Sequence, residues 1–101
     1  MGGLIFALRY IDVEWKHDFN YEPTRLVSEI GPDGYEIRKL EFFPDGLVGF
    51  AFESIESLNT RLGIDMVPSL EEINSQEEFQ GKSTSKEQFE LLWHKHVPSS
   101  S

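Results

Sequence analysis

The chain of 101 residues contains no cysteine, and this absence excludes three kinds of site. Without thiols there can be no disulfide framework, no thiolate zinc site and no cysteine nucleophile. The absence also fits a reducing compartment, so we expect a cytoplasmic location. With 39% hydrophobic and 13% aromatic residues, the sequence predicts a single domain over residues 1–98 and a frayed tail at residues 99–101.

Basic residues are scarce, because nine lysines and arginines stand against 18 aspartates and glutamates, which gives a formal net charge of −9. A surface of this sign repels nucleic acid and anionic lipid and attracts basic proteins. Long apolar runs are missing too, since residues 3–7 are too few to span a bilayer and lack the basic flank of a secretory signal. We therefore expect no nucleic-acid partner, no membrane, and a monomer or weak homodimer.

Sequence motifs of common enzymes are also lacking. The glycines fall near the start, in turns or in one predicted strand, and form neither a dinucleotide-binding fingerprint nor a phosphate-binding loop. The sequence also has no nucleophile elbow. We therefore predict a protein that is not an enzyme and has no cofactor.

Alternation of apolar and polar residues predicts four strands. The pattern is clearest at residues 10–16, where Ile11, Val13 and Trp15 share one face. Three further strands are predicted at residues 25–30, 35–42 and 47–52. Because residues 31–34 and 43–46 read as short turns, the four strands are expected to form a mostly antiparallel meander.

Two helices are predicted after the strands, because Ser69-x-x-Glu72 and Ser85-x-x-Gln88 both match a capping box. They should start near Leu70 and Lys86. In the second helix an apolar stripe would pack on one face of the sheet, formed by Phe89, Leu92, Trp93 and His96. The expected fold class is α+β, with a four-stranded sheet and two C-terminal helices gathered on one face.

The histidines raise two chemical hypotheses. His17 beside Asp18 could act as a general base, if the loop bent the two side chains into contact. His94 and His96 are two residues apart, which separates them widely on a helix, and no cysteine could complete a zinc site. In both cases ordinary surface or core histidines are the simpler interpretation, so we predict neither a catalytic nor a metal site.

Acidic residues concentrate between residues 53 and 80, where seven carboxylates stand against Arg61 alone. The segment PSLEEINSQEEF within it has four glutamates in eight residues. A magnesium site for phosphodiester chemistry would need basic groups nearby to hold the phosphate, and these are missing. Two interpretations remain. The glutamates either form a solvated helix start, where the helix dipole stabilises their negative charge, or they form a surface that attracts a basic partner.

Several short motifs resemble a family of small bacterial domains of unknown function. The motifs are Trp15-x-His17-Asp18, Tyr35-Glu36-x-Arg38-Lys39-x-Glu41, Asp45-Gly46 with Gly49, Thr60-x-Leu62-Gly63, and Pro68-x-Leu70-Glu71-Glu72-Ile73-Asn74. The resemblance as a whole extends over about residues 10–94. The resemblance implies a stand-alone domain and an association with polymorphic toxin and immunity loci. It brings no catalytic residues to this sequence.

Charge and resemblance together predict an immunity-type protein that binds and neutralises a basic, nuclease-like toxin domain. Its carboxylates would mimic phosphates and steer the toxin to the interface. The predicted acidic rim comprises Asp65, Glu71, Glu72, Glu77 and Glu78, and the predicted aromatic anchors are Tyr21, Tyr35 and Phe43. The alternative is a protein-protein interaction module of unassigned function.

Overall fold

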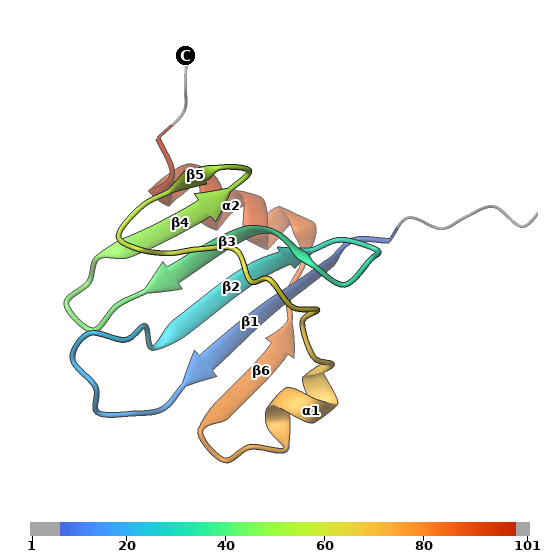
Figure 1. Cartoon of the computed structure of the whole chain (residues 1–101), viewed down its shortest axis with the longest axis horizontal. Coiled ribbons are helices and arrows are strands. Elements are labelled where there is room, and N and C mark those ends of the chain that lie inside the picture. The colour runs from blue at the N-terminus through green and yellow to red at the C-terminus, as the bar shows by residue number, and fades with distance from the viewer. Residues whose placement is uncertain (1–6, 99–101) are drawn as a thin grey trace, which may run out of the picture.

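The computed structural model describes residues 7–98, which form one antiparallel β-sheet flanked by two helices. The strands are β1 (Arg9–Trp15), β2 (Arg25–Ile30), β3 (Glu36–Phe42), β4 (Val48–Phe52), β5 (Ile55–Glu56) and β6 (Phe79–Ser83), and the helices are α1 (Leu70–Asn74) and α2 (Lys86–His96). The strand order is β5-β4-β3-β2-β1-β6 (Figure 1). The α+β class and the meander of β1 to β4 are confirmed.

Within residues 7–98 the sheet has six strands, so the prediction of four was wrong. β5 is a two-residue continuation of the hairpin that starts with β4. β6 pairs with β1, from which it is separated by most of the chain, and its sequence FQGKS has no regular apolar alternation. It lies on the other side of β1 from β2 and thereby places β1 inside the sheet.

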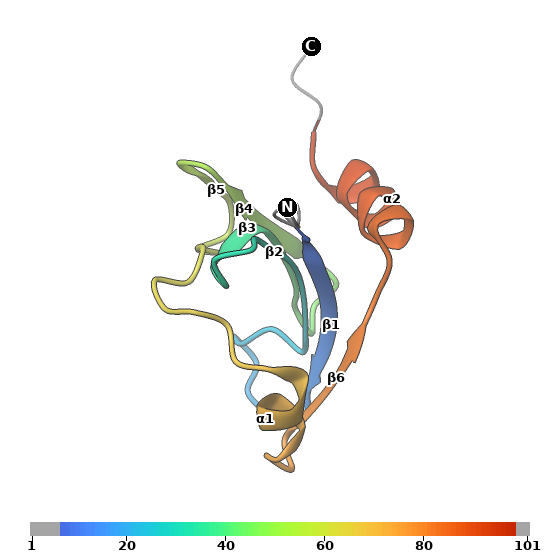
Figure 2. The same cartoon turned by 90° about the vertical axis from the view of Figure 1, so that its right-hand side faces the viewer.

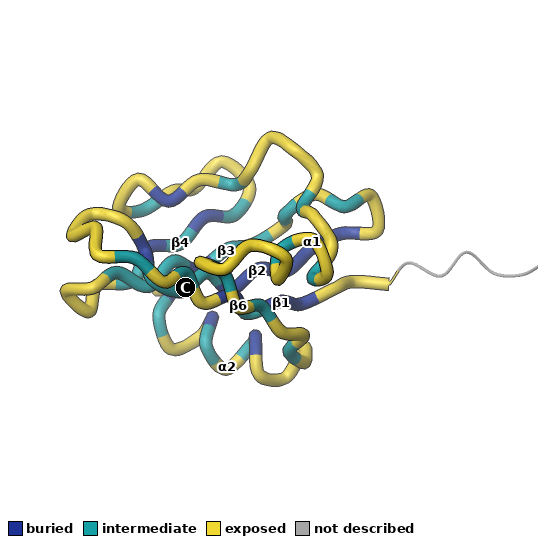
Figure 3. The backbone as a smooth tube through the Cα atoms, turned by 90° about the horizontal axis from the view of Figure 1, so that it is seen from below, coloured by how far each residue is buried: buried dark blue, intermediate teal, exposed yellow. Residues whose placement is uncertain are grey.

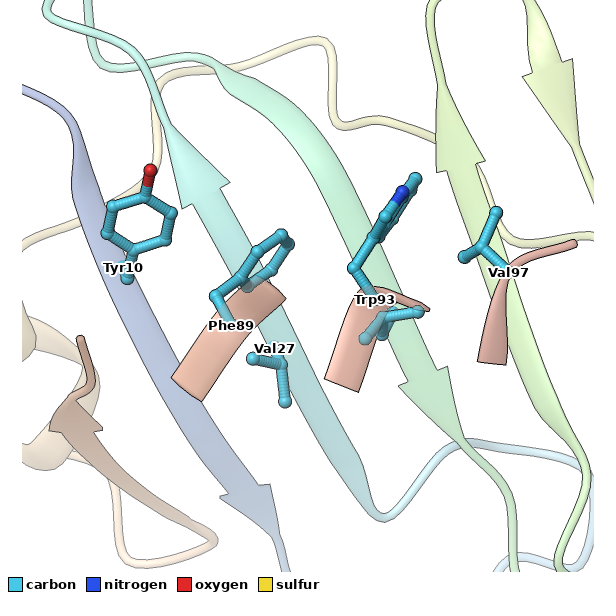
Figure 4. Packing of buried hydrophobic residues seen from close by; sticks show 6 residues of the cluster. Tyr10, Val27, Phe89, Trp93 and Val97 are labelled. Carbon is cyan, nitrogen blue, oxygen red and sulfur yellow. The ribbon is translucent and has the colours of Figure 1, made fainter. Parts of the chain in front are cut away.

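One face of the sheet, called here the α2 face, is covered by α2. Phe89 and Trp93 of the predicted helix stripe are buried there against Tyr10, Val27 and Leu40 (Figure 4). The helix begins as predicted, since the Ser85 side chain accepts a hydrogen bond from the backbone N–H of Gln88. The last predicted helix therefore packs on one sheet face, as the stripe indicated.

The opposite face, called the α1 face, is covered by α1 and by residues 57–69 (Figure 2). The expectation that both helices lie on one face was wrong, because Leu70 and Ile73 of α1 pack against Ile11 and Val13, whose side chains point away from α2. Because side chains alternate along β1, Tyr10 points to the α2 face and Ile11 and Val13 point to the α1 face. Both faces of the sheet are therefore apolar, and each needs a covering element.

Helix α1 also closes the free edge of β6. The Asn74 side-chain amide donates to the Gly81 carbonyl oxygen at 3.0 Å, and its oxygen accepts from the Gly81 N–H at 2.6 Å. A larger residue would be crowded at this place, since a Cβ at Gly81 would lie 3.0 Å from a Leu70 methyl carbon and 3.3 Å from a Val13 methyl carbon. A side chain thus occupies the hydrogen-bonding positions that a neighbouring strand would use.

The predictions for both ends of the chain lie outside the described residues. This applies to residues 1–6, which belong to the predicted domain over residues 1–98, and to the frayed tail at residues 99–101. Among residues 7–98, no helix has the length and apolar character needed to cross a membrane.

Candidate partner-binding surface

The loop after β1 is held by His17, which the sequence had suggested as a possible general base. Its Nδ1 accepts a hydrogen bond from the Phe19 N–H at 2.9 Å, and its Nε2 donates to the Pro23 carbonyl oxygen at 2.7 Å. The ring also packs edge-on against Trp15, with centroids 4.4 Å apart. Both ring nitrogens therefore bind the backbone of the loop, and the partner is not Asp18.

This ordered loop presents an exposed aromatic surface. Phe19 is 62% exposed and Tyr21 is 91% exposed. The turn between β3 and β4 lies at the same end of the sheet (Figure 1) and brings Phe43 beside Tyr21, so that both line the same hollows. We call this region the loop-end surface, and it consists of Trp15, Phe19, Tyr21 and Phe43.

The third predicted anchor, Tyr35, lies elsewhere. It follows the turn between β2 and β3, where its carbonyl oxygen accepts from the Gly31 N–H at 2.9 Å. In the meander this turn is at the opposite end of the strands from the loop-end surface (Figure 1). The structure therefore brings two of the three predicted aromatic anchors together and separates Tyr35 from them.

The five predicted acidic residues all have exposed side chains. None of them forms an ion pair within residues 7–98. The segment that carries them runs between the two ends of the strands. Val67, two residues after Asp65, bonds through its N–H to the backbone of the β2–β3 turn, whereas the backbone carbonyl oxygen of Glu78 accepts from the Lys16 N–H, at the start of the loop after β1. Figure 3 shows α1 and its neighbouring backbone as mostly exposed.

Glu72 lies at the start of α1 and bonds to the N-cap residue Ser69, although its carboxylate contacts the serine hydroxyl and not the backbone N–H that a capping box predicts. The Ser69 hydroxyl accepts from the Glu72 N–H at 3.2 Å and donates to the Glu72 carboxylate at 3.3 Å. Glu71 stands beside it in the first turn, where the helix dipole favours a negative charge. Helix-start stabilisation and an exposed negative surface are therefore compatible for these two residues.

Polar contacts that the sequence analysis missed hold residues 60–63 against the α1 face. The buried Thr60 hydroxyl donates to the Glu41 carboxylate at 2.8 Å, and the Lys39 ammonium donates to the Arg61 carbonyl oxygen at 3.2 Å. Glu36 accepts from the Gly63 N–H at 2.7 Å. The motif Tyr35-Glu36-x-Arg38-Lys39-x-Glu41 thus supplies three side chains, those of Glu36, Lys39 and Glu41, that fasten this segment. The only sequence signal for these contacts was the run of charged residues in β3, Glu36, Arg38, Lys39 and Glu41.

The α1 face also contains a largely apolar hollow of about 230 Å³, which is bounded by Val67, Pro68 and α1. Its walls include Ile11, Val13 and Ile73, and its polar side includes Ser28, whose hydroxyl donates to Glu36 at 3.0 Å. These polar groups bond to each other.

On the α2 face, a charged network fastens the helix to the sheet. Arg38 donates two hydrogen bonds to Glu29, at 2.6 and 2.9 Å, and two to Glu90 of α2, at 3.0 and 2.9 Å. These bonds hold the pKa values of both carboxyls below their usual range, against the opposing effect of burial, and they raise the pKa of Arg38. Burial, together with the bond that its hydroxyl donates to Glu29, raises the pKa of Tyr10 to about 12. These shifts arise from a closed set of bonds that joins three strands and a helix.

The two C-terminal histidines have different environments. His96 packs edge-on against Phe42, with centroids 5.3 Å apart, and its burial lowers the pKa of its imidazole. His94 is exposed, with its Nε2 at 3.7 Å from a Glu90 carboxylate oxygen. Residues 7–98 contain no group of three or more histidine, aspartate or glutamate side chains placed to hold a metal ion.

Comparison with known proteins supports a family assignment. The family described as a domain of unknown function, DUF6881, matches residues 9–98, nearly the whole chain, so the chain belongs to this family. This confirms the resemblance to a domain of unknown function, whereas the association with toxin and immunity loci stays a hypothesis. No significant match was found among curated proteins or solved structures.

Proposed function

For this member of the family, we propose a role as a small cytoplasmic immunity-type protein that binds and neutralises a basic, nuclease-like toxin domain. The observation that carries the proposal is the exposure of five carboxylates, at residues 65, 71, 72, 77 and 78, without ion pairs among residues 7–98. No lysine or arginine lies between Arg61 and Lys82 to offset them. A basic partner would supply the missing counter-charge.

The physical advantage of such a surface is rapid association. Unpaired charges of one sign raise the rate of encounter with an oppositely charged protein, and the effect weakens as salt screens the field. A nuclease has a basic cleft because its substrate is a polyanion. Carboxylates at the α1 face would take the place of phosphates there and block entry of the substrate.

Of the three predicted aromatic anchors, the proposed interface uses the two that lie together, Tyr21 and Phe43. Tyr21 and Phe43 lie together at the loop-end surface, and the backbone bond between Lys16 and Glu78 places the end of the acidic segment beside that loop. Aromatic residues supply much of the affinity at the centre of an interface, whereas surrounding charges mainly set the rate and specificity. One partner could therefore cover both features.

The second candidate is a protein-binding module of unassigned function without catalytic activity. The specific observation in its favour is the exposure of Phe19 and Tyr21, which together with Phe43 form an apolar patch whatever the charge of the partner. Exposed apolar patches on small domains often mark interaction sites. Under this alternative the glutamates of α1 serve the helix start and the solubility of the chain.

Co-expression with the C-terminal domain encoded by the gene immediately upstream tests the proposal. We expect that domain to stop growth when expressed alone, and growth to return together with a 1:1 complex when this protein is present. Absence of both toxicity and a complex would contradict the immunity function and favour the solubility interpretation of the glutamates.

The charge mechanism has its own test in the association rate. Reversing Glu71, Glu72, Glu77 and Glu78 to lysine should slow association more than about tenfold at low salt, because steering by charge can contribute a factor of about 10 to 1,000. As a control matched for net charge, Glu14→Lys with Glu53→Lys should slow association less than Glu71→Lys with Glu72→Lys. An unchanged rate in the quadruple variant would remove steering from the proposal.

A further inference from the structure

The chain twice surrounds an arginine with the same two kinds of group, an aromatic ring and carboxylates. The Arg25 guanidinium lies 4.7 Å from the centre of the Phe42 ring and donates two hydrogen bonds to Asp12. The Arg38 guanidinium lies 4.8 Å from the Phe89 ring centre and 5.0 Å from that of Trp93. In both cases the planar cation gains from the ring face and from charged acceptors at its edge.

A third group of the same composition exists at the loop-end surface, around a hollow of about 340 Å³. Its aromatic members are Trp15, Tyr21 and Phe43, and its carboxylates belong to Glu22 and Glu41. Among the described residues, no lysine or arginine lines this hollow. The chain therefore supplies the surroundings of an arginine here without supplying the arginine.

We propose that this hollow binds a guanidinium group, namely an arginine side chain of the basic partner. The inference rests on the proposed function for the existence of that partner, and it deepens it by naming the side chain that enters the surface. Arginine suits the site better than lysine because its guanidinium is planar, stacks on rings, is weakly hydrated and can bind a carboxylate through two parallel bonds.

The fixed parts of the hollow are already in place. Trp15 ends β1 and contacts the rings of His17 and Phe79, and the Phe43 N–H donates to the Leu47 carbonyl oxygen at 2.9 Å in the β3–β4 turn. Preorganised contact groups lower the entropic cost of binding. The hollow also falls in the range of roughly 300 to 1,000 Å³ that is typical of ligand sites.

The two carboxylates and Tyr21 contribute differently. Glu41 accepts from Thr60 and lies 3.7 Å from the Lys39 ammonium, so it is held in position but retains acceptor capacity. Glu22 is exposed and accessible to the edge of a guanidinium. Tyr21, at 91% exposure, can bury a large part of its ring against an incoming side chain.

The test uses three small probes: the Nα-acetyl N-methylamides of arginine, lysine and citrulline, followed by the backbone amide resonances of the protein. Arginine should give saturable shifts concentrated at Trp15, Tyr21, Glu22 and Phe43. Citrulline, the neutral isostere, should bind at least tenfold more weakly, and lysine at least threefold more weakly. Equal binding of citrulline or lysine, or shifts spread evenly over the acidic surface, would overturn the inference.

Variants locate the site. Tyr21→Ala and Glu22→Gln should each weaken arginine binding at least threefold, and both residues are exposed, so the fold should be retained. Their matched controls, Tyr35→Ala and Glu53→Gln, change exposed residues outside the hollow and should leave binding unchanged. Undiminished binding in Tyr21→Ala and Glu22→Gln would overturn the assignment.

The two proposals fail separately. No partner protein is present in the probe titration. Failure of the arginine probe to bind would therefore refute the arginine site alone, because the proposal of charge-driven association is tested separately by the association rate. Conversely, localised arginine binding without any complex or growth rescue in the co-expression experiment would overturn the proposed function alone.

Discussion

The two faces of the sheet are covered in different ways. On the α2 face, an eleven-residue helix buries large apolar side chains and is joined to three strands through Arg38. On the α1 face, a five-residue helix packs only half-buried apolar side chains against the sheet, and the irregular segment before it is held by single polar contacts at residues 60–63. This face also contains a hollow of about 230 Å³. Stability is thus expected to reside mainly on the α2 face, which leaves the α1 face free to carry exposed, unpaired carboxylates.

The largest expected effect that separates the faces is the loss of a core ring. Phe89→Ala should lower the free energy of unfolding by about 3 to 5 kcal/mol, because Phe89 is fully buried. Ile73→Ala on the other face should cost about 2 kcal/mol or less, since Ile73 is only half-buried. Urea unfolding of both variants measures the difference, and equal losses would contradict the unequal roles of the two faces.

The ion pairs of Arg38 on the α2 face make the stability of the protein dependent on pH. Arg38→Gln should cost about 2 to 3 kcal/mol near neutral pH, less than the roughly 3 to 5 kcal/mol for a fully buried pair, because the Arg38 and Glu90 side chains remain 19% and 31% exposed. The ion pair lowers the pKa values of Glu29 and Glu90 in the folded state, so the unfolded chain binds more protons as the pH falls.

The stabilisation by Arg38 should therefore be complete above the usual carboxyl pKa and should disappear as the pH falls through the lowered values. Unfolding measured between pH 3 and 8 should show the gap between wild type and Arg38→Gln closing on the acid side. Arg61→Gln is the control, because Arg61 is 75% exposed beside Glu56 and should change stability by less than about 1 kcal/mol. A gap independent of pH would exclude the ion pair as its cause.

The smallest expected effect concerns the edge of the sheet next to α1. Asn74→Ala removes both hydrogen bonds to the Gly81 backbone and should cost about 0.5 to 1.5 kcal/mol, because water can replace them at this exposed site. Hydrogen exchange at the Gly81 amide should become faster, whereas Gln80→Ala, also exposed on β6, should leave it unchanged. Unaltered exchange at Gly81 would show that Asn74 does not protect the edge.

The four meander strands and both helices could be predicted because their signals are local. Alternation marks the strands, and Ser69 and Ser85 mark the helix starts with hydroxyls that bond as the capping boxes require. β6 could not be found in this way, because its five residues contain Gly81, and what makes them a strand is the distant β1. β5, with two residues, is too short for any periodic pattern.

The arrangement of the candidate site was only partly accessible from the sequence. An antiparallel meander places its first and third connections at one end, so the proximity of Tyr21 and Phe43 and the separation of Tyr35 follow from the predicted topology. The position of Glu41 beside the hollow could not be predicted from the sequence. It depends on the hydrogen bond between Glu41 and Thr60, which are 19 residues apart in the chain. The pairing of Glu29 with Arg38 likewise needs the strand register.

The connection of β1 to both β6 and α2 has a consequence for synthesis on the ribosome. The four meander strands can pair as soon as they emerge, but Tyr10, Val27 and Leu40 stay uncovered until Phe89 and Trp93 have been made. At about 5 to 20 residues per second, an apolar sheet face is then open to solvent and to neighbouring nascent chains for seconds. Chaperones that recognise exposed apolar strands would thus meet this protein mainly before α2 is translated.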